Sequence, residues 1–348
     1  MRRSFAFVAA LAVTASIAVA CSGDDEPEAK EQKADPTTTT TAPPPPPAAP
    51  LTGLPDTTGA LTRPALSVKV ENSPESRPQS GLETADVVYE EVVEGGITRF
   101  VAIFNSVIPE VVGPIRSVRD MDPNIVWPVG GIFAYSGGAP GPVSHIMDAP
   151  VNLVDEGATG TAMYRDRGKA APHNLFGYTQ ALFDRGGQPV PPPPLFSYLA
   201  PGEPLATAPV VAEPVTSVRV GFQSGYDPTW TYDATTGTWL RSYGFQPFMA
   251  ASGAQIAPVN VVVQFIDYPG YSDGKTLGEG DVWVFAGGQV VRGRWVRPAP
   301  EQPAQFVDGF GAPIKLAPGN TWVELVPRNT AVDVVGPPPP ALAAPPAP

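Results

Sequence analysis

The stretch Arg99-Phe100-Val101-Ala102-Ile103-Phe104-Asn105 decides the fold of the first half of the chain. Its apolar middle is uninterrupted, it is rich in aromatic and branched residues, and polar residues bound it at both ends. Such a run is typical of a strand that is buried on both faces, because a strand with one solvated face would alternate apolar and polar residues. We therefore predict a central strand at 99–105.

Further elements are predicted on either side of this strand. Residues 65–70 and 132–136 indicate two more short strands, and residues 115–122 indicate a helix. The segment 82–94 carries both helical and strand patterns, and we leave it open between the two. Strands separated by helical stretches predict a mixed α/β domain over residues 51–185.

The second half of the chain has almost pure strand character. Gly-containing turns at 235–237 and 287–288 predict hairpins. Strand patterns occur at 217–222, 230–232, 238–241, 259–268, 281–286, 289–296 and 322–326. We expect a mainly antiparallel β domain at 215–335, which makes the whole protein α+β.

The N-terminus has the layout of a secretory signal peptide. Arg2 and Arg3 precede an uncharged apolar run from Ser4 to Ala20, and the only cysteine, Cys21, follows it. Cleavage before Cys21 would make its thiol the acceptor of a lipid such as palmitate and anchor the protein to a membrane. The paired arginines also leave the twin-arginine export route open beside general secretion. We predict a signal peptide at 1–20 and lipid attachment at Cys21.

Composition predicts the segments that connect these parts. Residues 21–50 are acidic, then rich in Thr and Pro, and lack an apolar face, so we expect a lipidated, disordered tether. Residues 186–214 are rich in proline and indicate a connection between the two domains. Residues 336–348 consist of Gly, Pro, Ala and Leu and predict a disordered tail.

Charge and cysteine content restrict the partners. The formal net charge is −12 and becomes −14 once Arg2 and Arg3 leave with the signal peptide. A chain this acidic is repelled by nucleic acid, so we expect no nucleic-acid partner. With Cys21 acylated, no internal disulfide can form. We expect an extracytoplasmic, lipid-anchored protein of the bacterial cell envelope.

The most unusual polar segment follows Gly113-Pro114. Arg116, Ser117 and Arg119 would lie in the first turn of the helix predicted there, where free backbone N–H groups and guanidinium groups suit an anion. We predict an anion-binding site from these residues and Arg99, supported by Glu94. The alternative is that the arginines only form structural ion pairs with Glu90, Glu91, Glu94 or Asp120.

A second polar segment contains one of only two histidines. His173 could act as a general acid or base, with Asp166 orienting it and with Arg165 and Asn174 in support. The alternative is a loop histidine bonded to the backbone. The other histidine, His145, has apolar neighbours and is predicted to be structural.

Motifs for metals and cofactors are missing from the sequence. Two histidines and one committed cysteine do not supply a typical zinc site. The sequence contains neither a GxxxxGK[ST] phosphate loop nor a dinucleotide fingerprint. We therefore predict no metal and no cofactor.

The motifs above resemble those of the YerB-type bacterial lipoproteins, and the similarity spans nearly all residues between tether and tail. The matching motifs include Arg77-Pro78-Gln79-Ser80-Gly81-Leu82, Glu94-Gly95-Gly96-Ile97-Thr98-Arg99, Gly113-Pro114-Ile115-Arg116-Ser117-Val118-Arg119, Ala171-Pro172-His173-Asn174-Leu175, Gly293-Arg294-Trp295 and Pro318-Gly319-Asn320-Thr321-Trp322. The resemblance implies a surface lipoprotein with two domains of unknown function, and it implies no reaction.

Two functions remain open at this point. The first is a cell-envelope lipoprotein that binds an anionic wall component through an arginine-lined cleft in the N-terminal domain. The second is a hydrolase or transferase that acts on an envelope polymer, with His173 and Asp166 at an arginine anion clamp. The distance between His173 and Arg116 discriminates between these two functions. An enzyme requires one reacting group to be within reach of both side chains.

Overall fold

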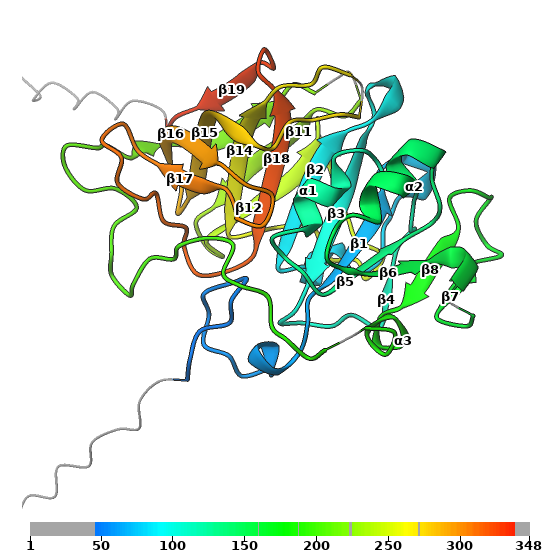
Figure 1. Cartoon of the computed structure of the whole chain (residues 1–348). Coiled ribbons are helices and arrows are strands. Elements are labelled where there is room, and N and C mark those ends of the chain that lie inside the picture. Colours follow the sequence, from blue (N-terminus) through cyan, green and yellow to red (C-terminus); the bar gives the residue numbers. More distant parts are fainter. Residues whose placement is uncertain (1–45, 159, 187, 223–224, 271, 338–348) are drawn as a thin grey trace, which may run out of the picture. The chain divides into compact units, whose positions relative to one another are not determined.

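A computed structural model describes residues 46–337 of the chain, except 159, 187, 223–224 and 271. Its main feature is one large mixed sheet (Figure 1) in the strand order β17-β16-β15-β14-β18-β2-β3-β1-β5-β6, with β9 (Glu213–Pro214) paired to β16. From the first half of the chain come β1 (Leu66–Glu71), β2 (Val87–Val92), β3 (Thr98–Phe104), β5 (Ile132–Tyr135) and β6 (Asn152–Asp155). From the second half come β14 (Asn260–Ile266), β15 (Gly278–Ala286), β16 (Gln289–Arg297), β17 (Gln305–Val307) and β18 (Thr321–Pro327).

Two smaller sheets and three short helices complete the described part of the fold. The five-stranded sheet is antiparallel and contains β10 (Ser217–Val220), β11 (Pro228–Asp233), β12 (Thr238–Tyr243), β13 (Gln246–Pro247) and β19 (Val332–Val335). The three-stranded sheet contains β4 (Val111–Val112), β7 (Met163–Arg165) and β8 (Leu175–Tyr178). The helices are α1 (Asp122–Val126), α2 (Pro140–Ile146) and α3 (Thr179–Phe183).

The two halves of the chain share the large sheet. β18 pairs in parallel with β2, so that Thr321 lies opposite Val87 and Leu325 lies opposite Glu91. The first half contributes parallel and antiparallel pairs, whereas the strands of the second half pair mostly antiparallel. The predicted α+β fold, with a mixed first half and a mainly antiparallel second half, is confirmed.

Alternation along the strands separates two hydrophobic cores, one on each face of the large sheet. Phe100 of β3 lies in the core that also contains Trp230 of β11 and Trp322 of β18. Its neighbour Val101 lies in the other core, which contains Ile125 of α1. Each β3 residue in these cores is fully buried, as the uninterrupted apolar run predicts.

Most of the predicted strands are present, and one predicted helix is wrong. The segment 82–94 forms a short 3₁₀ turn followed by β2. Residues 115–120 are not helical, because their N–H groups bond elsewhere: Ile115 N–H donates to the carbonyl of Leu175, and Arg116 N–H donates to that of Lys69. A helix begins only at Asp122.

The folded region begins before the expected end of the tether. Ala49, which we assigned to the disordered segment 21–50, is buried, and its N–H donates to the carbonyl of Leu54 over 2.7 Å. The backbone hydrogen bond and the burial of Ala49 order this end of the segment. The rest of that segment up to residue 45, the signal peptide and the tail from 338 lie outside the described residues.

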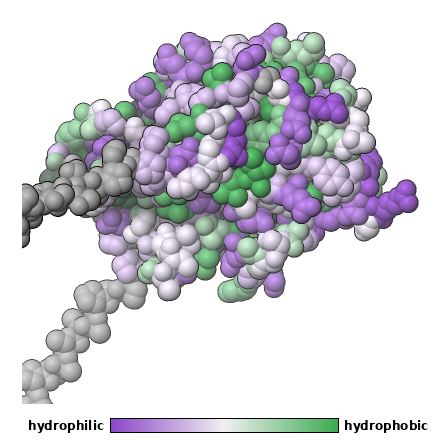
Figure 2. Space-filling view, turned by 90° about the horizontal axis from the view of Figure 1, so that it is seen from below, coloured by the Kyte–Doolittle hydropathy of each residue, from purple (hydrophilic) through white to green (hydrophobic). Residues whose placement is uncertain are grey.

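The surface offers little continuous apolar area in the view of Figure 2, where hydrophobic residues form small patches bordered by hydrophilic ones. None of the helices in the described ranges is long and apolar enough to cross a membrane.

Candidate functional site

A row of charged side chains lies on one face of the large sheet, at the ends of β1 and β2 and the start of β3. Glu71 of β1 and Glu91 of β2 are both register partners of Arg99 on β3. Partners on adjacent strands point to the same face, so these three charged groups are neighbours. All three side chains are buried, which is costly unless they pair with one another. The strand register of the sheet therefore fixes the relative positions of these three charged groups.

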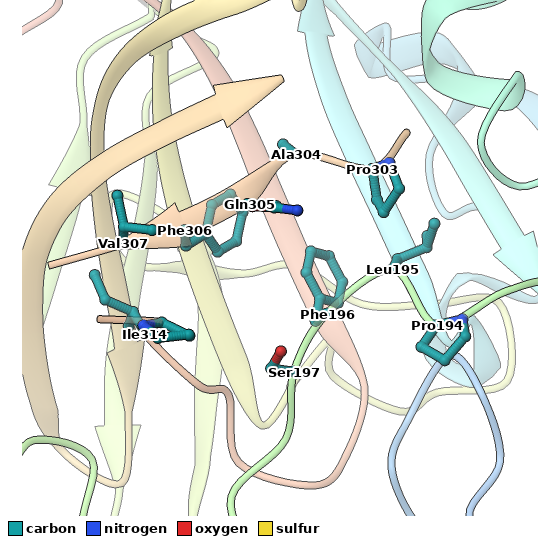
Figure 3. A pocket seen from close by; sticks show the side chains of 11 residues that line it. Pro194, Leu195, Phe196, Ser197, Pro303, Ala304, Gln305, Phe306, Val307 and Ile314 are labelled. Atoms are coloured by element: carbon teal, nitrogen blue, oxygen red, sulfur yellow. The ribbon is translucent and has the colours of Figure 1, made fainter. Parts of the chain in front are cut away.

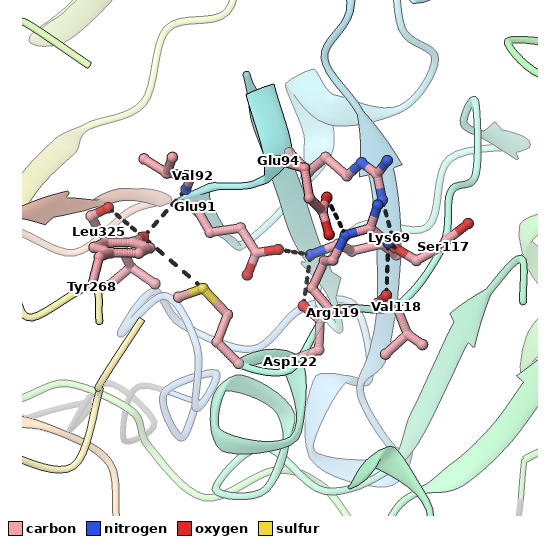
Figure 4. Close-up of polar contacts among 12 residues, drawn as sticks. Lys69, Glu91, Val92, Glu94, Ser117, Val118, Arg119, Asp122, Tyr268 and Leu325 are labelled. Carbon is pink, nitrogen blue, oxygen red and sulfur yellow. Dashed lines mark hydrogen bonds and ion pairs between the residues drawn. The ribbon is translucent and has the colours of Figure 1, made fainter. Parts of the chain in front are cut away.

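The deepest part of this row is a lysine between two carboxylates (Figure 4). Lys69 contacts Glu91 and, at 2.7 Å, Asp122, and the lysine and both carboxylates are fully enclosed. Burial raises the pKa of Glu91 to about 8, and the neighbouring charge of Asp122 adds to this rise. The positive charges of Lys69 and Arg99 oppose this rise.

The segment that carries Arg116 and Arg119 crosses the end of β1 in an extended conformation. Besides the bond from Arg116 to Lys69, the carbonyl of Arg116 accepts from Ser136 N–H, which follows β5. The Asp122 carboxylate accepts from the N–H of Arg119 over 2.7 Å. The backbone is held from both sides, so both guanidinium groups start from fixed positions.

Arg119 is committed to contacts within the protein (Figure 4). Its Nε donates to Glu94 over 2.7 Å, and its Nη1 donates to the carbonyl oxygens of Ser117 and Val118. Ser117 contributes its carbonyl, which also accepts from Arg99 Nη1 over 2.9 Å. Arg119 therefore has little donor capacity left for a ligand.

Arg99 is buried and incompletely paired. Its Nε is enclosed and has no hydrogen-bond partner among the described residues. Burial lowers the pKa of Arg99 to about 10, and the positive charges of Arg119 and Arg116 lower it further. The three arginines are thus close enough to repel one another, an arrangement that an anion would stabilise.

Arg116 retains the most donor capacity of the three arginines. Its Nε lies 3.1 Å from Glu71 Oε1, an ion pair in which the N–H is not aligned for a hydrogen bond. No hydrogen bond occupies its two terminal nitrogens among the described residues, and the side chain is 21% exposed. An approaching anion could therefore take both N–H groups of this guanidinium edge.

Glu71 also receives His173. The ring Nδ1 lies 2.9 Å from Glu71 Oε1 and 3.2 Å from the hydroxyl of Ser73, which itself donates to Glu71 over 3.1 Å. Arg116 Nε and His173 Nδ1 contact the same oxygen, so they are at most 6.0 Å apart, the sum of their two distances. The two polar segments of the sequence therefore meet.

The carboxylate at His173 differs from the one we expected. Asp166 accepts from the N–H of Gly168 over 2.8 Å and makes no hydrogen bond to His173 within the described ranges. This bond between Asp166 and the N–H two residues later forms an Asx turn, which holds the carboxylate in that local contact. Glu71 occupies the place that we assigned to Asp166.

The predicted supporting residues form a separate chain of contacts. Arg165 Nη1 donates to Asn174 over 2.8 Å, its Nη2 pairs with Glu156, and Asn174 donates to the carbonyl of Asp166 over 3.1 Å. This chain fixes the loop that carries His173. The other histidine, His145, is exposed and pairs with Asp120 at 2.9 Å.

A sizeable cavity in the described part of the chain lies away from this row. It has a volume of about 340 Å³, it is lined by Leu195, Phe196, Phe306 and Ile314 with neighbouring prolines (Figure 3), and no charged side chain lines it. In the part of the chain that the structure describes, no group of three or more His, Cys, Asp or Glu side chains could hold a metal ion. The charged row around Glu71 is therefore the best candidate for a site.

Comparison with known families agrees with this organisation. Residues 51–188 match the model described as "Protein of unknown function (DUF3048) N-terminal domain", and residues 218–323 match the corresponding C-terminal domain. The chain belongs to the DUF3048 family.

Two findings connect this DUF3048 chain to one relative. It is 28% identical over 308 residues to "Putative lipoprotein YerB" of Bacillus subtilis (strain 168), covering 82% of this chain and 88% of the relative. The crystal structure of the YerB protein from Bacillus subtilis matches with a TM-score of 0.69 at 25% identity, covering 82% of this chain and 99% of that one. The family resemblance seen in the sequence motifs is confirmed.

Two residues of the site in this DUF3048 protein, Glu71 and Ser73, were missed by reasoning from sequence. Glu71 ends a strand of sequence Leu-Ser-Val-Lys-Val-Glu, in which charged residues occupy alternate positions of an otherwise buried element. That alternation was the available signal, because charges on one face of a buried strand must meet partners there.

Proposed function

We propose that this protein is a lipid-anchored envelope protein that binds an anionic envelope component at the arginines around Glu71. The anchor rests on Cys21 at the end of the apolar N-terminal run, and the similarity to a relative named as a putative lipoprotein supports it. Its place is the extracytoplasmic face of the bacterial cell membrane, where wall polymers carry phosphate or carboxylate groups.

The observation that carries the binding proposal is the unused donor capacity of Arg116. Its terminal nitrogens have no hydrogen-bond partner among the described residues, whereas Arg119 donates to Glu94 and His173 contacts Glu71. A free guanidinium edge suits phosphate and carboxylate, because two parallel N–H groups match two oxygens. The buried Arg99 adds positive charge nearby, and its Nε–H has no hydrogen-bond partner among the described residues.

The rest of the protein makes this site selective. With a net charge of −12, the chain repels polyanions over most of its surface. An anionic polymer would therefore be held only where arginines gather.

Binding can be tested with a fluorescently labelled poly(glycerol phosphate) oligomer and the purified protein lacking residues 1–21. We expect Arg116→Gln to weaken binding roughly tenfold or more, because a charge-assisted hydrogen bond contributes about 1.5–3 kcal/mol. The matched control is Arg294→Gln, whose arginine is exposed on β16 and pairs with Glu279 and Asp281 of the neighbouring strand β15. Equal affinities for the wild type and Arg116→Gln would overturn the proposal.

The anchor is tested separately. In cells supplied with labelled palmitate, the wild-type chain should take up label and fractionate with membranes. Cys21→Ser should lose both properties, because it removes the only thiol of the chain. Retention of the label in Cys21→Ser would exclude this anchor.

A further inference from the structure

The Glu71 carboxylate connects two groups with complementary chemistry. Its Oε1 contacts both the Nε of Arg116, whose terminal N–H groups have no partner among the described residues, and the ring Nδ1 of His173. The side chain of Glu71 is only 2% exposed. Its second oxygen, Oε2, has no hydrogen-bond partner among the described residues. A buried carboxylate in this position fixes the histidine ring more strongly than a solvated one.

The contacts fix which ring nitrogen carries the proton. Ser73 donates its hydroxyl proton to Glu71, so both oxygens that face Nδ1 are available as acceptors. Nδ1 is therefore the protonated nitrogen of the neutral ring, and Nε2 presents a lone pair. This second nitrogen has no hydrogen-bond partner in the described residues, and 21% of the side chain is exposed. It can meet water or a ligand.

We propose that Glu71 and His173 form an acid–base pair that hydrolyses a phosphodiester held by Arg116. This inference rests on the proposed anion site and names the class of its substrate. A carboxylate bound at Arg116 would offer no leaving group. A bound phosphodiester is both the anion and the reacting centre, so a base beside the guanidinium can act on it directly.

The step balances with water as the only co-reactant. His173 Nε2 takes a proton from water as the water oxygen bonds to phosphorus, and the bond from phosphorus to the leaving alcohol oxygen breaks. The imidazolium then returns its proton to that oxygen, which gives an alcohol and a phosphomonoester. Arg116 stabilises the charge on the non-bridging oxygens, and Glu71 is a positioning residue that holds the tautomer and stabilises the imidazolium.

The test uses two probes, bis(4-nitrophenyl) phosphate for turnover and poly(glycerol phosphate) for both turnover and binding. We expect the wild type to release nitrophenol and to form phosphomonoester from the polymer, seen by phosphorus NMR. His173→Gln should lower kcat roughly 100-fold or more, the usual contribution of general acid–base catalysis, while polymer affinity stays within about threefold. The matched control is His145→Gln, whose histidine also pairs with a carboxylate, Asp120, but makes no hydrogen bond or ion pair with Glu71 or Arg116 in the described part of the chain, so this variant should keep full activity.

Glu71→Gln separates positioning from a structural role. It should lower kcat with little change in KM and should alter the pH profile of kcat, because the imidazolium loses its counter-charge. Turnover by His173→Gln at the wild-type rate, or polymer binding without product from either probe, would overturn this inference and leave the binding site standing. Equal polymer binding by the wild type and Arg116→Gln would instead contradict the proposed anion-binding function on which this inference rests.

Discussion

Glu90 of β2 and Arg241 of β12 form an ion pair of 2.8 Å across the two halves of the chain, with both side chains fully enclosed. The guanidinium packs against the rings of Trp230 and Trp322, at 4.9 and 4.6 Å from their centroids. A second carboxylate, Glu324, lies beside Glu90 in the β2–β18 register, and burial raises its pKa well above the usual range. One enclosed guanidinium therefore faces two enclosed carboxyl groups, at 2.8 Å from Glu90 and 3.4 Å from Glu324.

Arg241→Met is expected to destabilise the protein by about 3–5 kcal/mol, because it leaves the charge of Glu90 buried without a partner. Chemical denaturation measures this loss. Arg219→Met is the control, since Arg219 pairs with Asp227 and Asp333 at the surface and its loss should cost less than about 1 kcal/mol. Similar losses in both variants would contradict the prediction.

Two adjacent glycines before β5 allow a matched comparison of backbone strain. Gly130 and Gly131 have φ of 68° and 71°, in the left-handed region. A Cβ at Gly130 would meet nothing within 4 Å, whereas one at Gly131 would lie 2.3 Å from the carbonyl oxygen of Ala65. Gly130→Ala should cost about 1–2 kcal/mol from its backbone conformation alone.

Gly131→Ala should cost clearly more than Gly130→Ala, because the new methyl group must displace a strand backbone. Thermal unfolding of both variants tests the difference. Equal melting temperatures would show that β1 and β5 can move apart without penalty, against the prediction.

The stability of the protein should depend on pH through Asp86. Burial raises the pKa of Asp86 from 3.8 to about 6, so the native state holds its proton more tightly than the unfolded chain does. The stability from this group is therefore complete below pH 3.8 and is lost as pH rises through 6. The loss amounts to about 3 kcal/mol, since one pKa unit corresponds to about 1.4 kcal/mol.

Asp86→Asn should remove this pH dependence when the free energy of unfolding is measured between about pH 4 and 7. Asp56→Asn provides a contrast of opposite sign. Four backbone N–H groups lower the pKa of Asp56 to about 2, so its stabilising contribution is present above pH 3.8 and is lost as pH falls through 2. An unchanged pH profile in Asp86→Asn would contradict the assignment.

The tautomer of His173 can be measured directly. Nitrogen-15 NMR of the neutral ring should show the proton on Nδ1, because Glu71 and Ser73 both face that nitrogen. Since the chain has only two histidines, His145→Gln assigns the signals. A proton on Nε2 in the neutral ring would contradict the geometry on which the acid–base inference depends.

The strands could be predicted from sequence because their signals are local. The apolar run at 99–105 and the hairpin turns at 235–237 and 287–288 determine β3 and the β11–β12 and β15–β16 pairs without information from the rest of the chain. The pairing of β2 with β18 could not be predicted, since it joins Val87 to Thr321 and leaves no pattern in either strand.

The site was predictable only in part, for the same reason. Arg99, Arg116 and His173 stand out because of their residue types and their motifs. Glu71 reaches His173 across about 100 residues of sequence, and its role depends on where β1 ends. The helix predicted at 115–122 was wrong because long-range backbone acceptors on Lys69 and Leu175 outweighed local helical preference.

The place of β2 between β3 and β18 constrains the order of events during synthesis. A chain that emerges N-terminus first has made β2 and β3 long before residues 321–327 exist, so β2 keeps an open edge until the last part of the sequence arrives. Contacts so distant in sequence form slowly. The two halves of the large sheet can therefore join only after residues 321–327 have been made.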